Sequence, residues 1–161
     1  MSVDPEELRV AMRMWATGIT VVSAEHQGDR HGMTVSSFTS ISLDPPLVLV
    51  SLEQDRTTHH LVEASGNFGV SILSQGHREI SDRFAGRQTE QDDRFAGLDT
   101  FSLVSNIPLL AGSLAAFDCR VVSSYDAGTH TLFVGEVMGV LNKISDSPLV
   151  YFDQGYHHLE E

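Results

Sequence analysis

Residues 32–51 read GMTVSSFTSISLDPPLVLVS, and they carry the strongest structural signal in the chain. The first half places small hydroxyl side chains on a strand among apolar neighbours, while the run from Leu47 to Leu52 predicts a buried strand. Pro45 and Pro46 stand between them, and because neither proline can donate to a ladder, we expect strand pairing to stop there. The stretch therefore predicts a chain built mainly from β-strands.

Similar apolar alternation appears on both sides of this stretch. A polar turn at residues 26–30 joins the strand before it to a return strand through Ser42, which predicts one long hairpin. A second long hairpin is expected about a turn at residues 126–130. The expected strands lie at residues 19–24, 33–42, 47–52, 68–73, 113–125, 131–140 and 148–152.

Three short helices are expected at the periphery. Residues 4–16 combine a capping Asp4 and Pro5 at the first helical position with an apolar stripe that includes Trp15, and Gly18 should end the helix. The other two helices are expected at residues 58–65 and 77–85.

A chain of 161 residues is long enough for one domain with a core and too short for two ordinary ones, so we expect residues 1–161 to form a single domain. Six or more mostly antiparallel strands with a few short peripheral helices fit a β-barrel, because closure of the sheet removes exposed edges. The expected fold class is mainly β.

The charge and the cysteine content exclude several classes of function. A net charge of −12 disfavours binding to nucleic acid and to anionic membrane surfaces. No apolar run approaches about 18 residues, and the N-terminus has acids before its apolar residues, so neither a membrane span nor a signal peptide is expected. The single cysteine, Cys119, can form no internal disulfide and should lie in the core of a cytoplasmic protein.

Three segments offer donors for an anionic, planar ligand. Residues 32–40 supply hydroxyl and backbone donors without bulk, although a solvent-facing row of serines and threonines has the same pattern. Residues 56–59 open a helix directly after a strand, where free N–H groups and an arginine suit phosphate; the alternative is a threonine N-cap without a ligand. His130, at the turn of the second hairpin, can donate to a nicotinamide carbonyl or to a phosphate, or have no function.

Motifs for other chemistries are absent from the sequence. His59 with His60 and His157 with His158 are adjacent pairs, which on regular structure should point apart rather than converge on one metal. The sequence has no HExxH, no paired CxxC, no Walker loop and no GxSxG. We therefore expect no metal site, and we expect Cys119 to be a core residue rather than a nucleophile.

Blocks of residues along the whole chain resemble a known family. Residues 15–22, WATGITVV, and the stretch from Gly32 to Ser51 are similar to the opening of the flavin reductase-like, FMN-binding split-barrel family. The later blocks that follow in the same order are SGNFGVSIL at 65–73, SDRFA at 81–85, DRFAG at 93–97, PLLAGSLAAFDC at 108–119, HTLFVGEV at 130–137 and PLVYF at 148–152. The resemblance covers the chain from Leu8 to Leu159.

The resemblance implies a Greek-key, antiparallel split β-barrel that forms a homodimer, with flavin near the subunit interface. It also implies a place in two-component monooxygenases, where such reductases supply reduced flavin to an oxygenase. The residues that it assigns to the isoalloxazine and ribityl chain are Thr34, Val35, Ser36 and Ser37, with Ser51 and Leu52 beneath the ring. It assigns the phosphate to Thr57 and Thr58, the flavin tail to Arg83 and Phe84, and the nicotinamide to His130.

Two positions depart from the family pattern. Thr129 stands before His130, where the family commonly has an acidic residue, and this affects the nicotinamide assignment. Residues 53–56, EQDR, are more acidic than is usual before the phosphate site, which would weaken phosphate binding or alter the flavin preference.

The resemblance and the donors together predict an NAD(P)H:flavin oxidoreductase that reduces FMN or FAD with NADH or NADPH. Because the cofactors supply the reactivity, we expect no essential acid or base among the side chains, only donors that orient two stacked rings. One alternative is a flavin-binding electron-transfer or sensory protein without a nicotinamide site. Another is a split-barrel binding module for a different ligand, such as haem.

Overall fold

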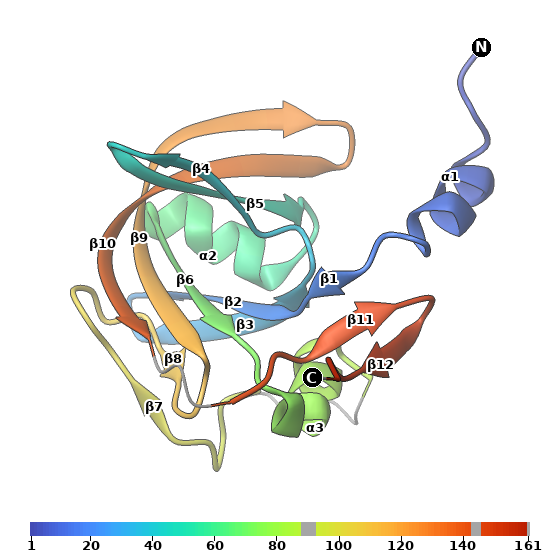
Figure 1. Cartoon of the computed structure of the whole chain (residues 1–161). Coiled ribbons are helices and arrows are strands. Elements are labelled where there is room, and N and C mark those ends of the chain that lie inside the picture. Colours follow the sequence, from blue (N-terminus) through green and yellow to red (C-terminus); the bar gives the residue numbers. More distant parts are fainter. Residues whose placement is uncertain (88–92, 143–145, 161) are drawn as a thin grey trace.

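The computed structural model describes residues 1–87, 93–142 and 146–160, and its main feature is one antiparallel sheet of seven strands. The strands follow the order β3-β2-β6-β9-β10-β5-β4, and the sheet curls around helix α2 (Thr57–Ser65), as Figure 1 shows. The bounds are β2 Thr20–His26, β3 Asp29–Val35, β4 Thr39–Leu43, β5 Pro46–Glu53, β6 Asn67–Ile72, β9 Ala115–Ala127 and β10 His130–Asn142. The edge strands β3 and β4 do not pair with each other in the described sheet, so the barrel is split. The mainly β, split-barrel prediction is confirmed.

Two small sheets and the remaining helices lie around this barrel. Their bounds are β1 Thr17–Gly18, β11 Val150–Phe152 and β12 Gly155–His157 in one sheet, β7 Thr100–Phe101 and β8 Leu109–Leu110 in the other, and the helices α1 Pro5–Met12, η1 Gln75–His77 and α3 Arg78–Phe84. Strand β12 was not expected from the sequence. None of the described helices is both long and apolar enough to cross a bilayer.

The prediction that strand pairing stops at Pro45 and Pro46 was wrong. Asp44 and Pro45 form the turn of a hairpin, and Leu43 of β4 pairs with Pro46 of β5. Pro46 is tolerated because it is the first residue of its strand, a position where the missing N–H removes little from the ladder. The turn therefore joins two paired strands rather than ending the pairing.

The predicted single strand through Ser42 was also wrong. Strand β3 ends at Val35, where it pairs with Thr20 of β2, and β4 begins at Thr39 on the other edge of the sheet, paired with β5. Residues 36–38, which we call the β3–β4 link, belong to neither strand and cross the split of the barrel.

Helix α2 and the second hairpin agree with the sequence. The helix starts one residue earlier than predicted and ends at Gly66, whose φ of 71° is the left-handed conformation that glycine adopts at low cost. Val62 of α2 is completely buried inside the barrel. The second hairpin closes over the two-residue turn Gly128–Thr129, a tighter turn than expected, so that β10 begins at His130.

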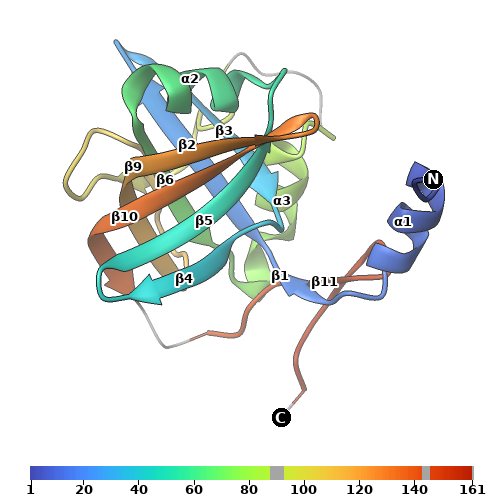
Figure 2. The ribbon, with the colours of Figure 1, turned by 90° about the horizontal axis from the view of Figure 1, so that it is seen from above.

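Helix α1 is shorter and less buried than its pattern predicts. Asp4 caps it by accepting a hydrogen bond from Glu6 N at 2.7 Å, but the helix ends at Met12. None of its residues is buried, and Leu8 and Trp15 remain 59% and 68% exposed. Figures 1 and 2 both show α1 standing clear of the barrel, joined to it through β1. Its apolar stripe therefore stays uncovered by the described residues of the chain.

Candidate functional site

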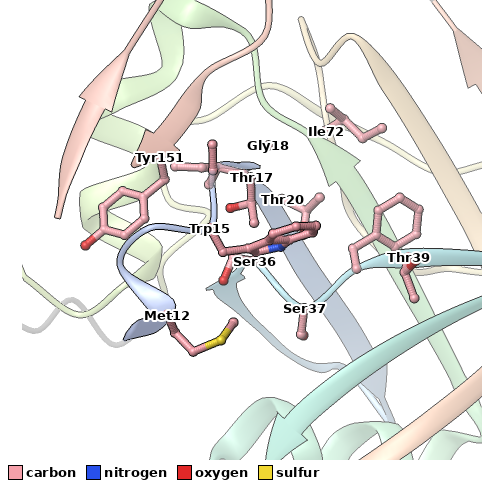
Figure 3. A pocket seen from close by; sticks show the side chains of 13 residues that line it. Met12, Trp15, Thr17, Gly18, Thr20, Ser36, Ser37, Thr39, Ile72 and Tyr151 are labelled. Atoms are coloured by element: carbon pink, nitrogen blue, oxygen red, sulfur yellow. The ribbon is translucent and has the colours of Figure 1, made fainter. Parts of the chain in front are cut away.

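A cavity of about 700 Å³ opens where the β3–β4 link passes β1 and β11. Its volume falls within the range of about 300–1,000 Å³ that is typical of small-molecule sites. The lining comes from segments far apart in the sequence: Met12 of α1, the residues from Trp15 to Thr20, the β3–β4 link, Thr39, Ile72 and Tyr151. Figure 3 shows these aromatic and hydroxyl side chains around one opening. The cavity thus offers flat apolar surfaces together with small polar groups.

The β3–β4 link is fixed to strand β5 by one serine. The Ser37 hydroxyl donates to Ser51 O at 2.9 Å and accepts from Ser51 N–H at 3.0 Å. Ser37 therefore replaces the ladder hydrogen bonds that the link does not make, and it leaves Ser36 exposed beside the cavity. The structure thus brings Ser36, Ser37 and Ser51 together, although Ser51 lines neither the large cavity nor the smaller one described below.

Ser36 also lines a smaller cavity of about 200 Å³ with Thr34 and Val35. Thr34 donates its hydroxyl to Ser81 O at 2.7 Å, so that proton is already used to hold α3 against β3. The two cavities share Ile19, Ser36 and Tyr151 in their linings. All four residues from Thr34 to Ser37 therefore line one of two adjoining cavities.

Thr17, near the cavity, has a buried side-chain oxygen to which no described residue forms a hydrogen bond. Its Oγ1 is buried and has no hydrogen-bond partner among the described residues, yet Thr17 lines the large cavity. Buried hydroxyls in native proteins are nearly always bonded, so this one is an exception. Solvent does not reach the oxygen, so other atoms of Thr17 face the cavity.

The start of α2 carries free backbone donors. Arg56 is the N-cap residue and its side chain makes no capping hydrogen bond in the part of the chain described, so the expected alternative of a threonine N-cap does not hold. Thr57 is exposed, whereas Thr58 is completely buried with its Oγ1 2.8 Å from His31 Nδ1. A phosphate at this helix end would therefore meet backbone N–H groups and the Thr57 hydroxyl.

Strand β5 connects this helix end to the serines of the link. Only Leu52 stands between Ser51 and Glu53, and Glu53 faces His130 in the β5–β10 pairing. Glu53 accepts from Arg56 Nε at 2.7 Å, so the acidic residue is paired with the adjacent arginine rather than free. His130 does not line the large cavity; its Nδ1 lies 3.0 Å from Thr129 Oγ1 at the hairpin tip.

Three residues that the resemblance assigns to the flavin direct their side chains elsewhere. Leu52 and Phe84 are completely buried in the two apolar clusters, and the Phe84 ring packs on Phe95 with centroids 4.9 Å apart. Arg83 Nη1 donates to Ala96 O at 3.0 Å, on the segment after α3. Gly32 permits the Phe84 packing, because a Cβ there would lie 2.8 Å from the ring. Neither Arg83 nor Phe84 lines the two adjoining cavities.

Sequence reasoning missed several residues of the site. They are Met12, Trp15, Thr17 and Tyr151 in the large cavity and Ser81, Ala85, Arg87 and Tyr156 in the smaller one. Trp15 and Thr17 belong to the WATG block that the resemblance uses, so their type was visible but their role was not. Tyr156 lies on the unexpected strand β12 and donates to Asp82 Oδ1 at 2.7 Å.

Two further groups with reactive side chains, Cys119 and the pair His59 and His60, lie outside both cavities. Burial raises the pKa of the Cys119 thiol to about 12, which confirms a core residue rather than a nucleophile. The expectation that adjacent histidines point apart is wrong for His59 and His60, whose ring centroids lie 5.7 Å apart. Successive helical residues are only about 100° apart around the axis, so two long side chains can approach each other.

The half-buried His31 makes stability depend on pH. Burial, followed by the charge of Arg94, lowers the pKa of His31 below its usual 6.5, with Asp93 acting in the opposite direction. In the unfolded chain the imidazole takes up a proton near pH 6.5, but the folded chain resists this until a lower pH. The free energy of unfolding should therefore be fully maintained above pH 6.5 and decrease as the pH falls below it.

Urea denaturation at a series of pH values from 8 to 5 measures this slope, and His31→Gln should make it shallower. His77→Gln is the matched variant, because burial also lowers the pKa of His77. A His31→Gln slope equal to that of the wild type would contradict the prediction.

Comparison with known proteins places this geometry in a family. Residues 12–160 match the family model described as flavin reductase like domain. The NADH-dependent flavin reductase StyB of Pseudomonas fluorescens is 39% identical over 160 residues, which is 98% of this chain and 91% of that protein. The flavin reductase of styrene monooxygenase from Pseudomonas putida S12 superposes with a TM-score of 0.84 at 40% identity, covering 96% of this chain and 98% of that one.

A second solved structure is that of a relative in complex with ligands. The NADH:FAD oxidoreductase SgcE6 of Streptomyces globisporus C-1027, in complex with NAD and FAD fragments, has a TM-score of 0.90 at 32% identity and covers 99% of this chain and 97% of that one. Both the sequence and the fold therefore match along nearly the whole length. The chain belongs to the flavin reductase-like family.

Proposed function

We propose that this protein is an NAD(P)H:flavin oxidoreductase that reduces FMN or FAD, with residues 1–161 acting as one domain. The observation that carries the proposal is the cavity of about 700 Å³ at the β3–β4 link, in a chain whose family includes NADH-dependent flavin reductases. Bound flavin supplies a ring that accepts hydride from a reduced nicotinamide. NADH is the favoured donor, because it is the one in the names of the relatives.

The side chains around the cavity place rings rather than carry out chemistry. Ser36 would bond to the polar edge of the flavin, while Trp15 and Tyr151 offer flat apolar faces. Ser37 holds the link against Ser51, so the donors are already ordered before a ligand arrives. Preorganised placement of two stacked rings is sufficient for hydride transfer and needs no acid–base pair from the protein.

The flavin phosphate would lie at the start of α2. The exposed Thr57 and the free N–H groups of the first turn form an anion site, reinforced by the positive end of the helix dipole. His130 stands at the same end of β5, opposite Glu53, and we assign it to the nicotinamide. The side chains of Leu52, Thr58 and Phe84 are buried and contribute to packing, while Arg83 holds the segment after α3.

Mixing purified protein with NADH and FMN tests the activity directly. NADH absorbance should fall and, under anaerobic conditions, FMN colour should bleach, whereas protein without FMN should leave NADH unchanged. The assay is repeated with FAD and with NADPH. No turnover with either flavin and either nicotinamide would refute the proposal, and yellow protein without NADH oxidation would favour a flavin-binding protein without a nicotinamide site.

One pair of substitutions tests the two ends of the site. Thr57→Asp should raise the Michaelis constant for FMN about tenfold, a change of about 1.4 kcal/mol, by placing a carboxylate against the phosphate. Riboflavin lacks the phosphate and should be almost unaffected; Thr57→Asn is the neutral control of the same shape. His130→Ala should raise the Michaelis constant for NADH more than that for FMN. Equal changes for FMN and riboflavin would contradict the phosphate assignment.

We further propose a homodimer in which a second copy covers α1. The helix buries no residue in the protomer, and its exposed apolar side chains continue directly into Met12 and Trp15 at the cavity. Contact at α1 would therefore close the open side of the flavin cavity. Sedimentation should show a dimer that Leu8→Glu converts to monomer, while Glu7→Gln, on an exposed polar neighbour, leaves it intact.

The reduced flavin would leave for a separate enzyme. A relative is named as the flavin reductase of styrene monooxygenase, and a flavin-dependent oxygenase is the corresponding partner for this chain. The cytoplasm supplies reduced nicotinamide and keeps Cys119 as a thiol, so we place the reaction there.

A further inference from the structure

Three side chains on α2, outside the cavities described above, gather their ligand atoms in one place. The ring nitrogens of His59 and His60 and a carboxylate oxygen of Glu63 all lie within 4.8 Å of one another. Glu63 follows His59 by four residues and His60 by three, the two spacings that put side chains next to each other on a helix. His59 Nδ1 and Glu63 Oε2 are 3.7 Å apart.

His59 contains a buried atom that no described residue satisfies. The side chain is only 4% exposed, and its Nε2 lies 2.8 Å from Thr131 Oγ1. Its Nδ1 is buried with no hydrogen-bond partner in the described part of the chain. A buried polar atom without a partner is uncommon in a native protein and calls for a ligand.

The hydrogen bonds behind His59 fix which nitrogen is free. Thr131 donates its single hydroxyl proton to Asp126 Oδ1 at 3.0 Å, so it can only accept from His59. His59 therefore carries its proton on Nε2, and Nδ1 presents a lone pair toward His60 and Glu63. Metal-bound histidines have this arrangement, with the second ring N–H given to a fixed acceptor that sets the tautomer.

We propose that His59 Nδ1, His60 and Glu63 bind one zinc-like divalent transition-metal ion, with Asp126 and Thr131 as positioning residues. Two imidazoles and one carboxylate are a donor set that suits zinc, with a water molecule as the fourth ligand. Tetrahedral bonds of about 2.0–2.2 Å put ligand atoms about 3.3–3.6 Å apart. His60 and Glu63 are exposed and can rotate by the small amount this requires.

The site lies apart from the two cavities, although it shares helix α2 with the proposed phosphate contact, and it differs from the flavin site in its effect. None of its three ligands lines either cavity, and all three lie on the first two turns of α2. An ion that binds only the folded chain stabilises it by mass action, so its main effect would be on stability rather than on hydride transfer. The net charge of −12 favours binding of a cation.

Calorimetric titration of chelator-treated protein with ZnCl₂ tests the proposal, with Co²⁺ absorbance as a second readout of coordination. We expect one ion per chain and a higher melting temperature with zinc. Glu63→Gln and His60→Ala, both on exposed positions, should each weaken binding at least about tenfold and abolish the melting shift. His158→Ala, at an exposed histidine elsewhere, should change neither.

Thr131→Val separates positioning from ligation. The substitution removes the acceptor of the His59 N–H while leaving all three ligands, and zinc affinity should fall on the order of 10–100-fold. Wild-type affinity in the Glu63→Gln and His60→Ala proteins would overturn the proposal, as would wild-type protein that binds no zinc at millimolar concentration.

Discussion

Ser36→Trp should lower kcat/KM for FMN on the order of 100-fold, a loss of about 2.7 kcal/mol. Ser36 is exposed and lines both adjoining cavities, so an indole at this position would occupy the space in which the flavin ring is expected. The residue lies in the β3–β4 link, outside every ladder, and its substitution therefore breaks no strand pairing. Steady-state assays with NADH at a series of FMN concentrations measure the effect.

Ser36→Ala is the matched control, because it removes only the hydroxyl. We expect a loss of no more than about tenfold from a single hydrogen bond. Thermal melting of both variants should stay close to that of the wild type. If Ser36→Trp kept wild-type activity with an unchanged melting temperature, the flavin would have to bind away from this cavity.

Asp118→Ala should have the largest effect on stability, a loss of about 2–4 kcal/mol in the free energy of unfolding. Asp118 is 1% exposed, and its Oδ2 accepts from the backbone N–H groups of Val104 and Ser105 at 2.9 and 2.7 Å. The Ser105 hydroxyl adds a third donor at 2.9 Å. Leaving a buried donor without its charged acceptor costs about 1–3 kcal/mol. The cost per donor is lower here because solvent reaches the loop that contains Val104.

Asp118→Asn distinguishes the hydrogen bonds from the charge. One carbonyl oxygen remains to accept from both backbone donors, so the loss should be about 1 kcal/mol. Urea denaturation with an unchanged m-value gives both numbers. Equal losses for the alanine and asparagine variants would show that the negative charge, rather than the acceptor geometry, holds the loop.

Local patterns predicted most of the elements because each was bounded by a residue with a clear physical role. Gly66 ended α2 in the left-handed conformation, and the glycine at 128 marked the second hairpin. Strand β12 was missed because its turn uses Asp153 and Gln154, which adopt positive φ without glycine. The break at residues 36–38 could not be predicted because two serines and a phenylalanine continue the strand pattern while the pairing partner changes from β2 to β5.

Residues of the candidate site could be predicted from the sequence where their type marks them. They could not be predicted where folding brings distant segments of the chain together. Ser36 and Ser37 stood out as small hydroxyl residues. Trp15 and Tyr151, in contrast, line one cavity because β1, near the start of the chain, pairs with β11, near its end. Phe84 was expected at the ligand, yet the helical period turns it toward the core. The free Nδ1 of His59 depends on a hydrogen-bond chain that no spacing rule reveals.

In the proposed homodimer, the detached position of α1 would tie catalytic competence to protein concentration. A helix of eight residues with no buried side chain is marginal by itself and would fray in an isolated chain. Fraying would carry Met12 and Trp15 away from the proposed flavin cavity, since Met12 ends that helix and Trp15 follows three residues later. Specific activity would then decline on dilution, and a cell could limit flavin reduction simply by making less of the protein.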